Sequence, residues 1–263
     1  MEVRDVNFSY NGTDAILKNV SFTIQKNKIN TIVGPNGSGK STLLEILARL
    51  LSPNSGDVLL EGKSIFEWKA KEFAQNVAIV HQSNVLPNEL MVKELLYFGR
   101  LPYKNWRMTR TKEDDKEDDL AVERALMQTE LTEKAEKFVD SLSGGERQRV
   151  FIATALVQDT PILLLDEPTT FLDMYFQLEI LELVKRLNQE ENLTIVMILH
   201  DLNQALMYSD HLIVMKNGEV VAKGEPEELL TTDLIAETYG VVADVLNDAN
   251  NGKYIVPQRR KEF

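Results

Sequence analysis

One short segment constrains the fold of this chain more than any other: a glycine-rich loop between an apolar run and a helical pattern. The loop fits G-x-x-x-x-G-K-[ST] and reads Gly34-Pro35-Asn36-Gly37-Ser38-Gly39-Lys40-Ser41. Residues 29–33 precede it and read Ile-Asn-Thr-Ile-Val, which favours a buried strand. Leucines at helical spacing follow it and predict a helix beginning near Lys40, namely Leu43, Leu44, Leu47, Leu50 and Leu51. A strand, a loop and a helix in this order predict a phosphate-binding loop.

The chemistry of the loop suits a nucleoside triphosphate. Its glycines let backbone N–H groups turn toward a phosphate, and the N-terminus of the following helix adds positive potential. Lys40 can reach the outer phosphates, and the Ser41 hydroxyl can bind Mg²⁺. The alternative is a glycine turn before a helix that carries a lysine by chance, which the two correct flanks disfavour. We therefore predict that the segment from Gly34 to Thr42 binds a nucleoside triphosphate.

A second candidate group lies downstream, where the apolar run 162–165 ends in two carboxylates, Asp166 and Glu167. Ligands of open α/β folds bind at the carboxyl ends of the strands. Asp166 can hold Mg²⁺ there, and Glu167 can orient or deprotonate a water molecule. The alternative is a strand end that turns at Pro168, and the upstream glycine loop makes that interpretation the less favoured one.

Composition excludes several other classes of protein. The 263 residues include 41 acidic and 29 basic side chains, a net charge of -12, three histidines and no cysteine. A disulfide scaffold, a thiolate metal site and a cysteine nucleophile are therefore excluded, and a histidine-built metal centre is disfavoured. The acidic excess argues against a nucleic-acid partner, since such a partner requires a basic face. No apolar run approaches the ~18 residues of a membrane span, and the first residues lack the pattern of a signal peptide, so we expect a soluble, cytoplasmic chain.

The order of the patterns predicts an α/β fold with a helical insertion. Asn11-Gly12 and Asn217-Gly218 are hairpin signals between strand-like runs. A helical stripe between residues 162–165 and 194–199 completes a βαβ unit, which indicates a parallel sheet. Residues 92–156 are helical and polar in pattern. Further strands are expected at residues 3–10, 20–24, 58–60, 77–80, 213–215 and 220–222.

A third segment precedes the two carboxylates and reads Leu142-Ser143-Gly144-Gly145-Glu146-Arg147-Gln148-Arg149. Two glycines before a polar helix make a second anion-binding N-terminus, with Ser143 as N-cap or phosphate donor. A simple capped helix start is the alternative. The segment closely resembles the signature motif of ATP-binding cassette (ABC) ATPases, and the resemblance covers nearly the whole chain. The resemblance implies an α/β fold: a P-loop NTPase core of the RecA-like type, with an antiparallel β subdomain and an inserted helical subdomain.

The resemblance also implies roles for residues that carry no weight alone. Tyr10 lies where the family stacks an aromatic ring on adenine, and Gln82 matches the Q-loop glutamine that contacts Mg²⁺ or water. Phe171-Leu172-Asp173 resembles the D-loop, which crosses between subunits. His200 matches the switch histidine that contacts the γ-phosphate. The resemblance implies that Glu167, Gln82 and His200 are the catalytic residues. It also implies a Mg²⁺ site formed by Ser41, Gln82 and Asp166.

The family also implies partners and a domain plan. Two copies of the chain associate head to tail, so that each ATP lies between the glycine loop of one copy and the signature residues Leu142 to Glu146 of the other. We expect one ABC ATPase domain over residues 1–263, with a nucleotide-binding core (1–87 and 155–225), a helical subdomain (88–154) and a C-terminal acidic extension (226–263). Transmembrane permease subunits would hold the chain at the cytoplasmic face of the membrane, and an extracytoplasmic binding protein would deliver the substrate.

The segment Gly99-Arg100-Leu101-Pro102-Tyr103 resembles the Gly-Arg-x-Pro-His segment of ATPases that serve iron-siderophore, haem and cobalamin importers, with tyrosine in place of histidine. Iron-siderophore import is the preferred function. The alternatives are another transported substrate, including haem, cobalamin, a metal or an exported molecule, and an ABC ATPase outside transport. A P-loop kinase or GTPase is disfavoured, because residues 27–30 read Asn-Lys-Ile-Asn instead of a guanine-binding Asn-Lys-x-Asp, and neither class explains Ser143-Gly144-Gly145.

Overall fold

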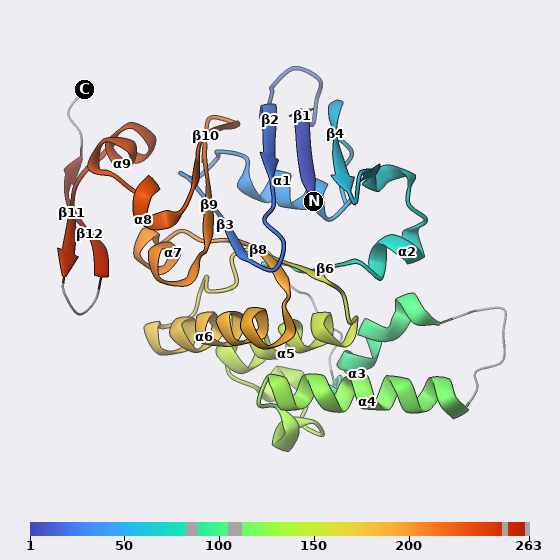
Figure 1. The fold of residues 1–263 in the computed structure, drawn as a ribbon. Helices are drawn as coiled ribbons and strands as arrows, with labels where there is room; N and C mark the ends of the chain where they lie inside the picture. Colours follow the sequence, from blue (N-terminus) through green and yellow to red (C-terminus); the bar gives the residue numbers. More distant parts are fainter. Residues whose placement is uncertain (83–88, 105–111, 249–251, 261–263) are drawn as a thin grey trace. The chain divides into compact units, whose positions relative to one another are not determined.

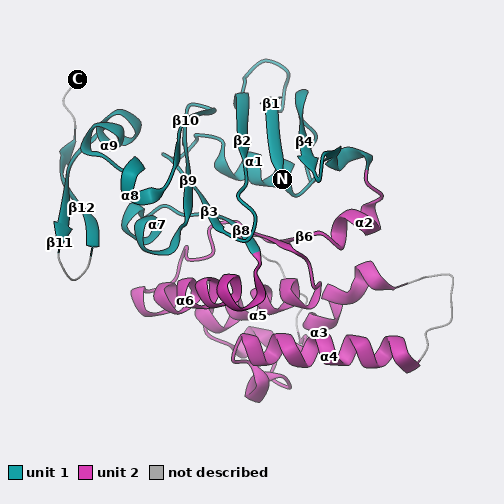
Figure 2. Ribbon diagram, viewed as in Figure 1, with its two compact units in different colours: residues 1–67, 194–263 teal, residues 68–193 magenta. Residues whose placement is uncertain are grey.

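The structure, a computed structural model, describes residues 1–82, 89–104, 112–248 and 252–260 (Figure 1). The chain divides into two compact units (Figure 2). Unit 1 contains Met1–Glu67 and Thr194–Phe263, and unit 2 contains Trp68–Leu193. The expected first residue of the helical subdomain, Asn88, lies outside the described residues.

Unit 1 begins with an antiparallel sheet in the order β2-β1-β4-β5. The Asn11-Gly12 signal correctly predicts its first hairpin. Along β1, Val3, Val6 and Phe8 are buried while the residues between them are more exposed, so one face of the sheet packs on the core. The elements are β1 (Glu2–Phe8), β2 (Leu17–Thr23), β4 (Ser55–Leu60), β5 (Lys63–Ser64) and η1 (Ile65–Glu67).

The second sheet of unit 1 carries the phosphate loop. β3 (Ile29–Val33) pairs in parallel with β8 (Thr194–Ile198) and β9 (His211–Lys216), and β10 (Glu219–Gly224) pairs antiparallel with β9 across Asn217-Gly218. Every residue of β3 and of β8 is buried, as the continuous apolar run of residues 194–199 predicts for β8 in a parallel sheet. α1 (Lys40–Leu47) follows β3, and α7 (Leu202–Tyr208) follows β8.

Helix α1 is shorter than the leucine pattern predicts. The helix ends at Leu47, and Leu50 and Leu51 lie beyond it. Arg49 adopts a left-handed φ of 59°, and the N–H of Leu50 donates to the carbonyl of Glu45 at 2.8 Å. These are the features of a Schellman helix end, in which glycine is the usual left-handed residue. The sequence does not reveal the end because an arginine takes that position.

The C-terminal part of unit 1 is folded, although the sequence indicated only an acidic extension. It consists of α8 (Pro226–Leu229), α9 (Thr232–Tyr239) and an antiparallel hairpin of β11 (Val241–Asp248) and β12 (Gly252–Arg260). Ala243, Ile235 and Leu230 are buried, which anchors these elements in the core of the unit.

Unit 2 contains the predicted helical insertion and one parallel strand pair, β6 (Val77–Val80) with β7 (Ile162–Leu165). Helices α3, α4 and α5 share a buried apolar cluster that includes Leu96, Val122 and Val150. The remaining elements are α2 (Ala70–Ala74), α3 (Val92–Tyr97), η2 (Phe98–Tyr103), α4 (Lys112–Gln128), η3 (Thr132–Lys134), η4 (Val139–Ser141), α5 (Gly144–Val157) and α6 (Met174–Glu191). Across the described ranges, no helix has the length and apolar character to cross a bilayer.

Candidate nucleotide site

The phosphate loop of unit 1 has the backbone geometry that its glycines predict. Gly37 and Gly39 have left-handed φ angles of 77° and 95°, and Gly39 is the N-cap of α1. A Cβ atom on Gly34 would overlap the carbonyl oxygen of Met215 in β9. Glycine is therefore required at Gly34 by close packing and is favoured at Gly37 and Gly39 by the turn.

Two buried side chains fit the predicted anion-binding role of the loop. Lys40 is only 5% exposed, and its Nζ donates to the carbonyl oxygens of Gly34 at 2.8 Å and Pro35 at 3.0 Å. An ammonium group curled inside the loop places positive charge where phosphates would lie. The Ser38 Oγ is fully buried and has no hydrogen-bond partner among the described atoms. A buried hydroxyl without a partner is costly unless a ligand supplies one, so Ser38 fits a phosphate oxygen.

Tyr10 lies beside the start of α1. Its hydroxyl is 3.3 Å from the Oγ1 of Thr42, and its ring packs edge-on against Phe8 with centroids 4.9 Å apart. The ring is 59% exposed, which leaves it accessible to a stacked base. Its contact with adenine stays a prediction.

His200 and the phosphate loop lie at the same edge of the sheet in unit 1. Ile32 pairs with Ile198 in the parallel register of β3 and β8. Gly34 and His200 each lie two residues beyond this pair, so both follow the carboxyl ends of neighbouring strands. The sequence order alone could not show this adjacency.

In unit 2, three predicted site residues come together at the end of β7. The Nε2 of Gln82 donates to the Oε2 of Glu167 at 2.6 Å, and the Oγ1 of Thr170 donates to the same oxygen at 3.0 Å. Asp166 directly follows β7, and its N–H donates to the Val80 carbonyl of β6 at 2.9 Å. Glu167 has a left-handed φ of 50°, an unusual conformation for a glutamate that redirects the side chain at the strand end. Thr170 is a contact that sequence reasoning missed.

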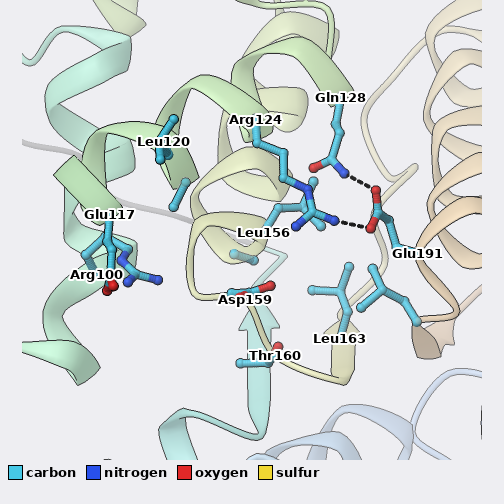
Figure 3. A pocket seen from close by; sticks show the side chains of 13 residues that line it. Arg100, Glu117, Leu120, Arg124, Gln128, Leu156, Asp159, Thr160, Leu163 and Glu191 are labelled. Carbon is cyan, nitrogen blue, oxygen red and sulfur yellow. Dashed lines mark hydrogen bonds and ion pairs between the residues drawn. The ribbon is translucent and has the colours of Figure 1, made fainter. Parts of the chain in front are cut away.

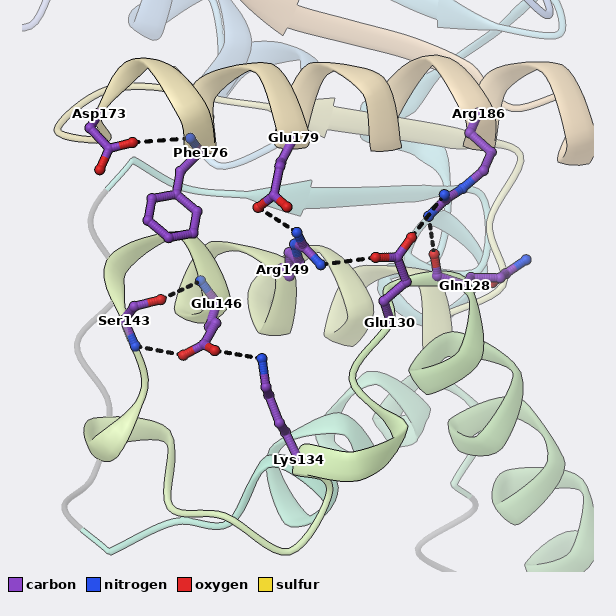
Figure 4. Close-up of polar contacts among 10 residues, drawn as sticks. All are labelled: Gln128, Glu130, Lys134, Ser143, Glu146, Arg149, Asp173, Phe176, Glu179 and Arg186. Carbon is purple, nitrogen blue, oxygen red and sulfur yellow. Dashed lines mark hydrogen bonds and ion pairs between the residues drawn. The ribbon is translucent and has the colours of Figure 1, made fainter.

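The signature segment forms a capped helix start (Figure 4). The Ser143 Oγ accepts from the N–H of Glu146 at 3.3 Å, and the Glu146 carboxylate accepts from the N–H of Ser143 at 2.8 Å. Lys134 also donates to this carboxylate and, with the Ser143 N–H, lowers the pKa of Glu146 to about 2. Glu146 therefore stays ionised at the helix N-terminus, where the helix dipole favours a negative charge. Lys134, from a distant turn, is a second residue that the sequence did not indicate.

Gly145, within this segment, and Asp173, which Figure 4 shows beside Phe176, have clear structural roles. A Cβ on Gly145 would lie 2.6 Å from Cγ and 3.0 Å from Cβ of Phe176, so glycine lets α5 and α6 pack closely. The Asp173 Oδ1 accepts from the N–H of Phe176 at 3.1 Å and caps α6. A Cβ on Gly144 would meet nothing closer than the Cδ2 of Leu172, at 3.4 Å.

The predicted residues thus form two groups. Unit 1 holds Tyr10, the loop from Gly34 to Thr42 and His200, and unit 2 holds Gln82, Asp166, Glu167, Leu142 to Glu146, and Asp173. A separate cavity of about 330 Å³ in unit 2 contains none of them; Arg124 and Gln128 of α4 reach across it to the carboxylate of Glu191 (Figure 3).

The glycine loop, the strand-end carboxylates and the capped signature helix define an ATP-binding cassette, and comparison with known proteins agrees. The ABC transporter family model matches residues 17–170. A probable siderophore transport system ATP-binding protein of Bacillus subtilis (YusV) is 48% identical over 90% of this chain and 85% of its own length. The petrobactin import ATP-binding protein FpuC of Bacillus anthracis is 45% identical over 92% of this chain and 88% of its own length.

Among solved structures, the ATP-binding cassette MJ0796 is similar, in a dimeric post-hydrolysis state bound to ADP and Pi. It has a TM-score of 0.70 and 32% identity, and the match covers 86% of this chain and 98% of that chain. The chain therefore belongs to the ABC transporter family and has the ABC ATPase fold, with a RecA-like P-loop core. It is an ABC-type ATPase that binds ATP. The predicted family, fold class and enzyme class are confirmed, and a P-loop kinase or GTPase is excluded.

Proposed function

We propose that the chain hydrolyses ATP with Glu167 as the group that activates water. The observation that carries this proposal is the pair of hydrogen bonds that Gln82 and Thr170 donate to the Glu167 carboxylate. They hold one carboxylate oxygen in a fixed position beyond the strand end, as a base that orients a water molecule requires. His200, which follows the carboxyl end of β8 in unit 1, is proposed to contact the γ-phosphate.

The donor set fits Mg²⁺. The Ser41 hydroxyl, the Asp166 carboxylate and the Gln82 carbonyl oxygen are hard oxygen ligands of the kind that Mg²⁺ prefers, together with phosphate oxygens and water. Within the described ranges, no group of three or more His, Asp or Glu side chains forms a metal site by itself. When bound, Mg²⁺ would neutralise charge on the phosphates.

The signature segment is proposed to bind the ATP held by a second copy of the chain. The Ser143 cap and the open surface at Gly144 leave the first turn of α5 accessible to a phosphate, and the similar cassette MJ0796 is dimeric. Two reciprocal sites follow from two-fold symmetry. ATP binding would then close the dimer, and hydrolysis would release it.

The substrate proposal is import of iron-siderophore complexes. Both relatives described above are named for siderophore or petrobactin import, and they match this chain over most of its length. The chain would bind permease subunits through its helical subdomain (88–154) at the cytoplasmic face of the membrane, with the binding protein acting on the outer side.

Uptake of radioactive iron tests this proposal in cells that lack the endogenous gene and carry either the wild-type chain or Glu167→Gln. We expect the wild-type chain to restore uptake from an iron-siderophore complex, and Glu167→Gln to bind ATP, form a stable dimer and transport nothing. The control is Glu190→Gln, which removes the same charge from an exposed position of α6 and is expected to retain full uptake. Uptake by Glu167→Gln at the wild-type rate would remove Glu167 from the reaction. If the wild-type chain restored uptake of haem or cobalamin but not of the iron-siderophore complex, haem or cobalamin would be the substrate instead.

A further inference from the structure

The folded C-terminal part of unit 1 (residues 226–248 and 252–260) has no role in the proposed reaction, yet it contacts α7, which begins just after His200, and β9, which packs on the first glycine of the phosphate loop. Its hairpin packs against α7, the helix that begins two residues after His200. Its helix α9 accepts a hydrogen bond from Lys216 at the end of β9. Both contacts lie within unit 1 (Figure 2).

The contact with α7 is a paired hydrogen bond of the kind that joins two strands. The Nδ2 of Asn203 donates to the carbonyl oxygen of Ile255 at 3.1 Å, and its Oδ1 accepts from the N–H of Ile255 at 2.8 Å. An amide side chain therefore satisfies both backbone groups of one residue of β12. Ile255 itself is 6% exposed, so this junction is well packed.

Asn203 is also tied to the residue that follows His200. The Asp201 carboxylate caps α7 and accepts from the backbone N–H of Asn203 at 2.7 Å. At the other end of α7, the Ser209 hydroxyl is 2.6 Å from the Thr31 hydroxyl of β3. The helix is thus fixed at its start by the hairpin and at its end by the strand that leads into the phosphate loop.

Helix α9 forms the second contact. Lys216, which ends β9, donates from its Nζ to the carbonyl oxygen of Glu237 in α9. The hydroxyl of Tyr239, the last residue of α9, is buried without a hydrogen-bond partner among the described atoms, and burial raises its pKa. At Gly34, the Met215 carbonyl of β9 leaves no room for a side chain. The C-terminal elements are therefore tied to β9, the strand that packs on the first residue of the loop.

We propose that the C-terminal hairpin holds the start of α7, and with it His200, in register with the phosphate loop, and that Asn203 is the positioning residue. The inference rests on the proposed contact between His200 and the γ-phosphate. It predicts that loss of the hairpin contact slows hydrolysis without weakening ATP binding, because Asn203 acts through His200 and does not touch the nucleotide.

The test is a double-mutant cycle on the full-length chain with its permease, with kcat, KM for ATP and nucleotide affinity measured for Asn203→Ala, His200→Ala and the double variant. We expect Asn203→Ala to lower kcat about tenfold while KM and nucleotide affinity change less than about twofold. Asn203→Asp keeps the acceptor for the Ile255 N–H and loses the donor, so we expect a smaller loss of about threefold. In the His200→Ala background, Asn203→Ala should have no further effect, because residues that act as one unit are not additive.

Lys253→Ala is the matched control for stability. It removes the 2.6 Å hydrogen bond from Lys253 Nζ to the Glu227 carbonyl, which ties down the same hairpin without contacting α7. We expect it to lower the unfolding midpoint as Asn203→Ala does while leaving kcat unchanged. If the losses of kcat in Asn203→Ala and His200→Ala multiply in the double variant, or if kcat is unchanged in Asn203→Ala, the positioning role of Asn203 is overturned and the proposed role of His200 is unaffected. Wild-type kcat in His200→Ala would contradict the proposed role of His200, and the inference would fall with it.

Discussion

Gly145→Ala places a methyl group where the ring of Phe176 already lies. The new Cβ would be 2.6 Å from Cγ and 3.0 Å from Cβ of Phe176, both closer than ordinary van der Waals contact. Because Cβ is the first atom of the Phe176 side chain, a rotation of the ring does not remove the overlap. Helix α5 or α6 must shift, and such overpacking typically costs about 1–3 kcal/mol.

Gly144→Ala is the matched control at the preceding position of the same helix. A Cβ there meets nothing closer than 3.4 Å, and its neighbour is the Cδ2 of Leu172. Alanine is up to about 1 kcal/mol better than glycine within a helix, so this variant should be unchanged or slightly more stable. Gly145→Ala has the same propensity gain, so this gain cancels when the two variants are compared. Their difference in the free energy of unfolding is therefore the overpacking cost, about 2 kcal/mol.

Thermal and urea unfolding of the two variants measure this difference. For a chain of this size, about 2 kcal/mol corresponds to about 4–8 °C in the unfolding midpoint. Phe176→Ala should remove most of the cost of Gly145→Ala, because the two residues are in direct contact. Equal midpoints for Gly144→Ala and Gly145→Ala would refute the argument that close packing of α5 on α6 requires Gly145.

Three further changes test other parts of the structure. Lys134→Met should lower the free energy of unfolding at pH 7 by about 1 kcal/mol, since the pair is partly exposed. In urea unfolding at several pH values, the difference in the free energy of unfolding between Lys134→Met and the wild type should shrink as pH falls from 4.5 toward 2. The reason is that Glu146, whose pKa is held at about 2, contributes its stability only while ionised. A difference that is constant with pH would contradict this. Asp118→Ala should cost about 3–5 kcal/mol in the same assay, because it leaves the buried Arg100 guanidinium without its 2.7 Å carboxylate partner; a loss below 1 kcal/mol would contradict it. Lys40→Ala should weaken ATP binding at least about tenfold in calorimetry, since it removes the buried positive charge that is predicted to bind the outer phosphates, and an unchanged affinity would exclude the loop as the site.

The sequence predicts local features of the site well where one segment contains all the residues concerned. The phosphate loop depends on a strand, its glycines and a helix start that are consecutive in the chain. The cap at Ser143 and Glu146 spans four residues, and its residue types indicate it directly. These features are local, so neither needs knowledge of the tertiary fold.

Contacts between distant segments could not be predicted in this way. Lys134 reaches Glu146 from η3, a separate element. Thr170 lies only three residues from Glu167, but its contact depends on a turn in which a glutamate adopts a left-handed conformation, and the residue types do not indicate that conformation. The hairpin of β11 and β12 was missed because neither strand, β11 with two aspartates or β12 with three basic residues and a proline, has the strict alternation that identifies a half-buried strand. Its pairing and its contact with Asn203 depend on the tertiary fold.

The departure at Tyr103 from the Gly-Arg-x-Pro-His segment has a physical explanation. The Tyr103 ring stacks on the Arg100 guanidinium, with 3.9 Å from Cζ to the ring centroid, and its hydroxyl donates to the Gln158 carbonyl at 3.0 Å. Arg100 is in turn held by Asp118. The position therefore requires a flat ring over a buried cation and one polar donor at its far end, and tyrosine supplies both. A tyrosine here is compatible with the segment's packing, so the substitution does not weigh against the proposed importer subclass.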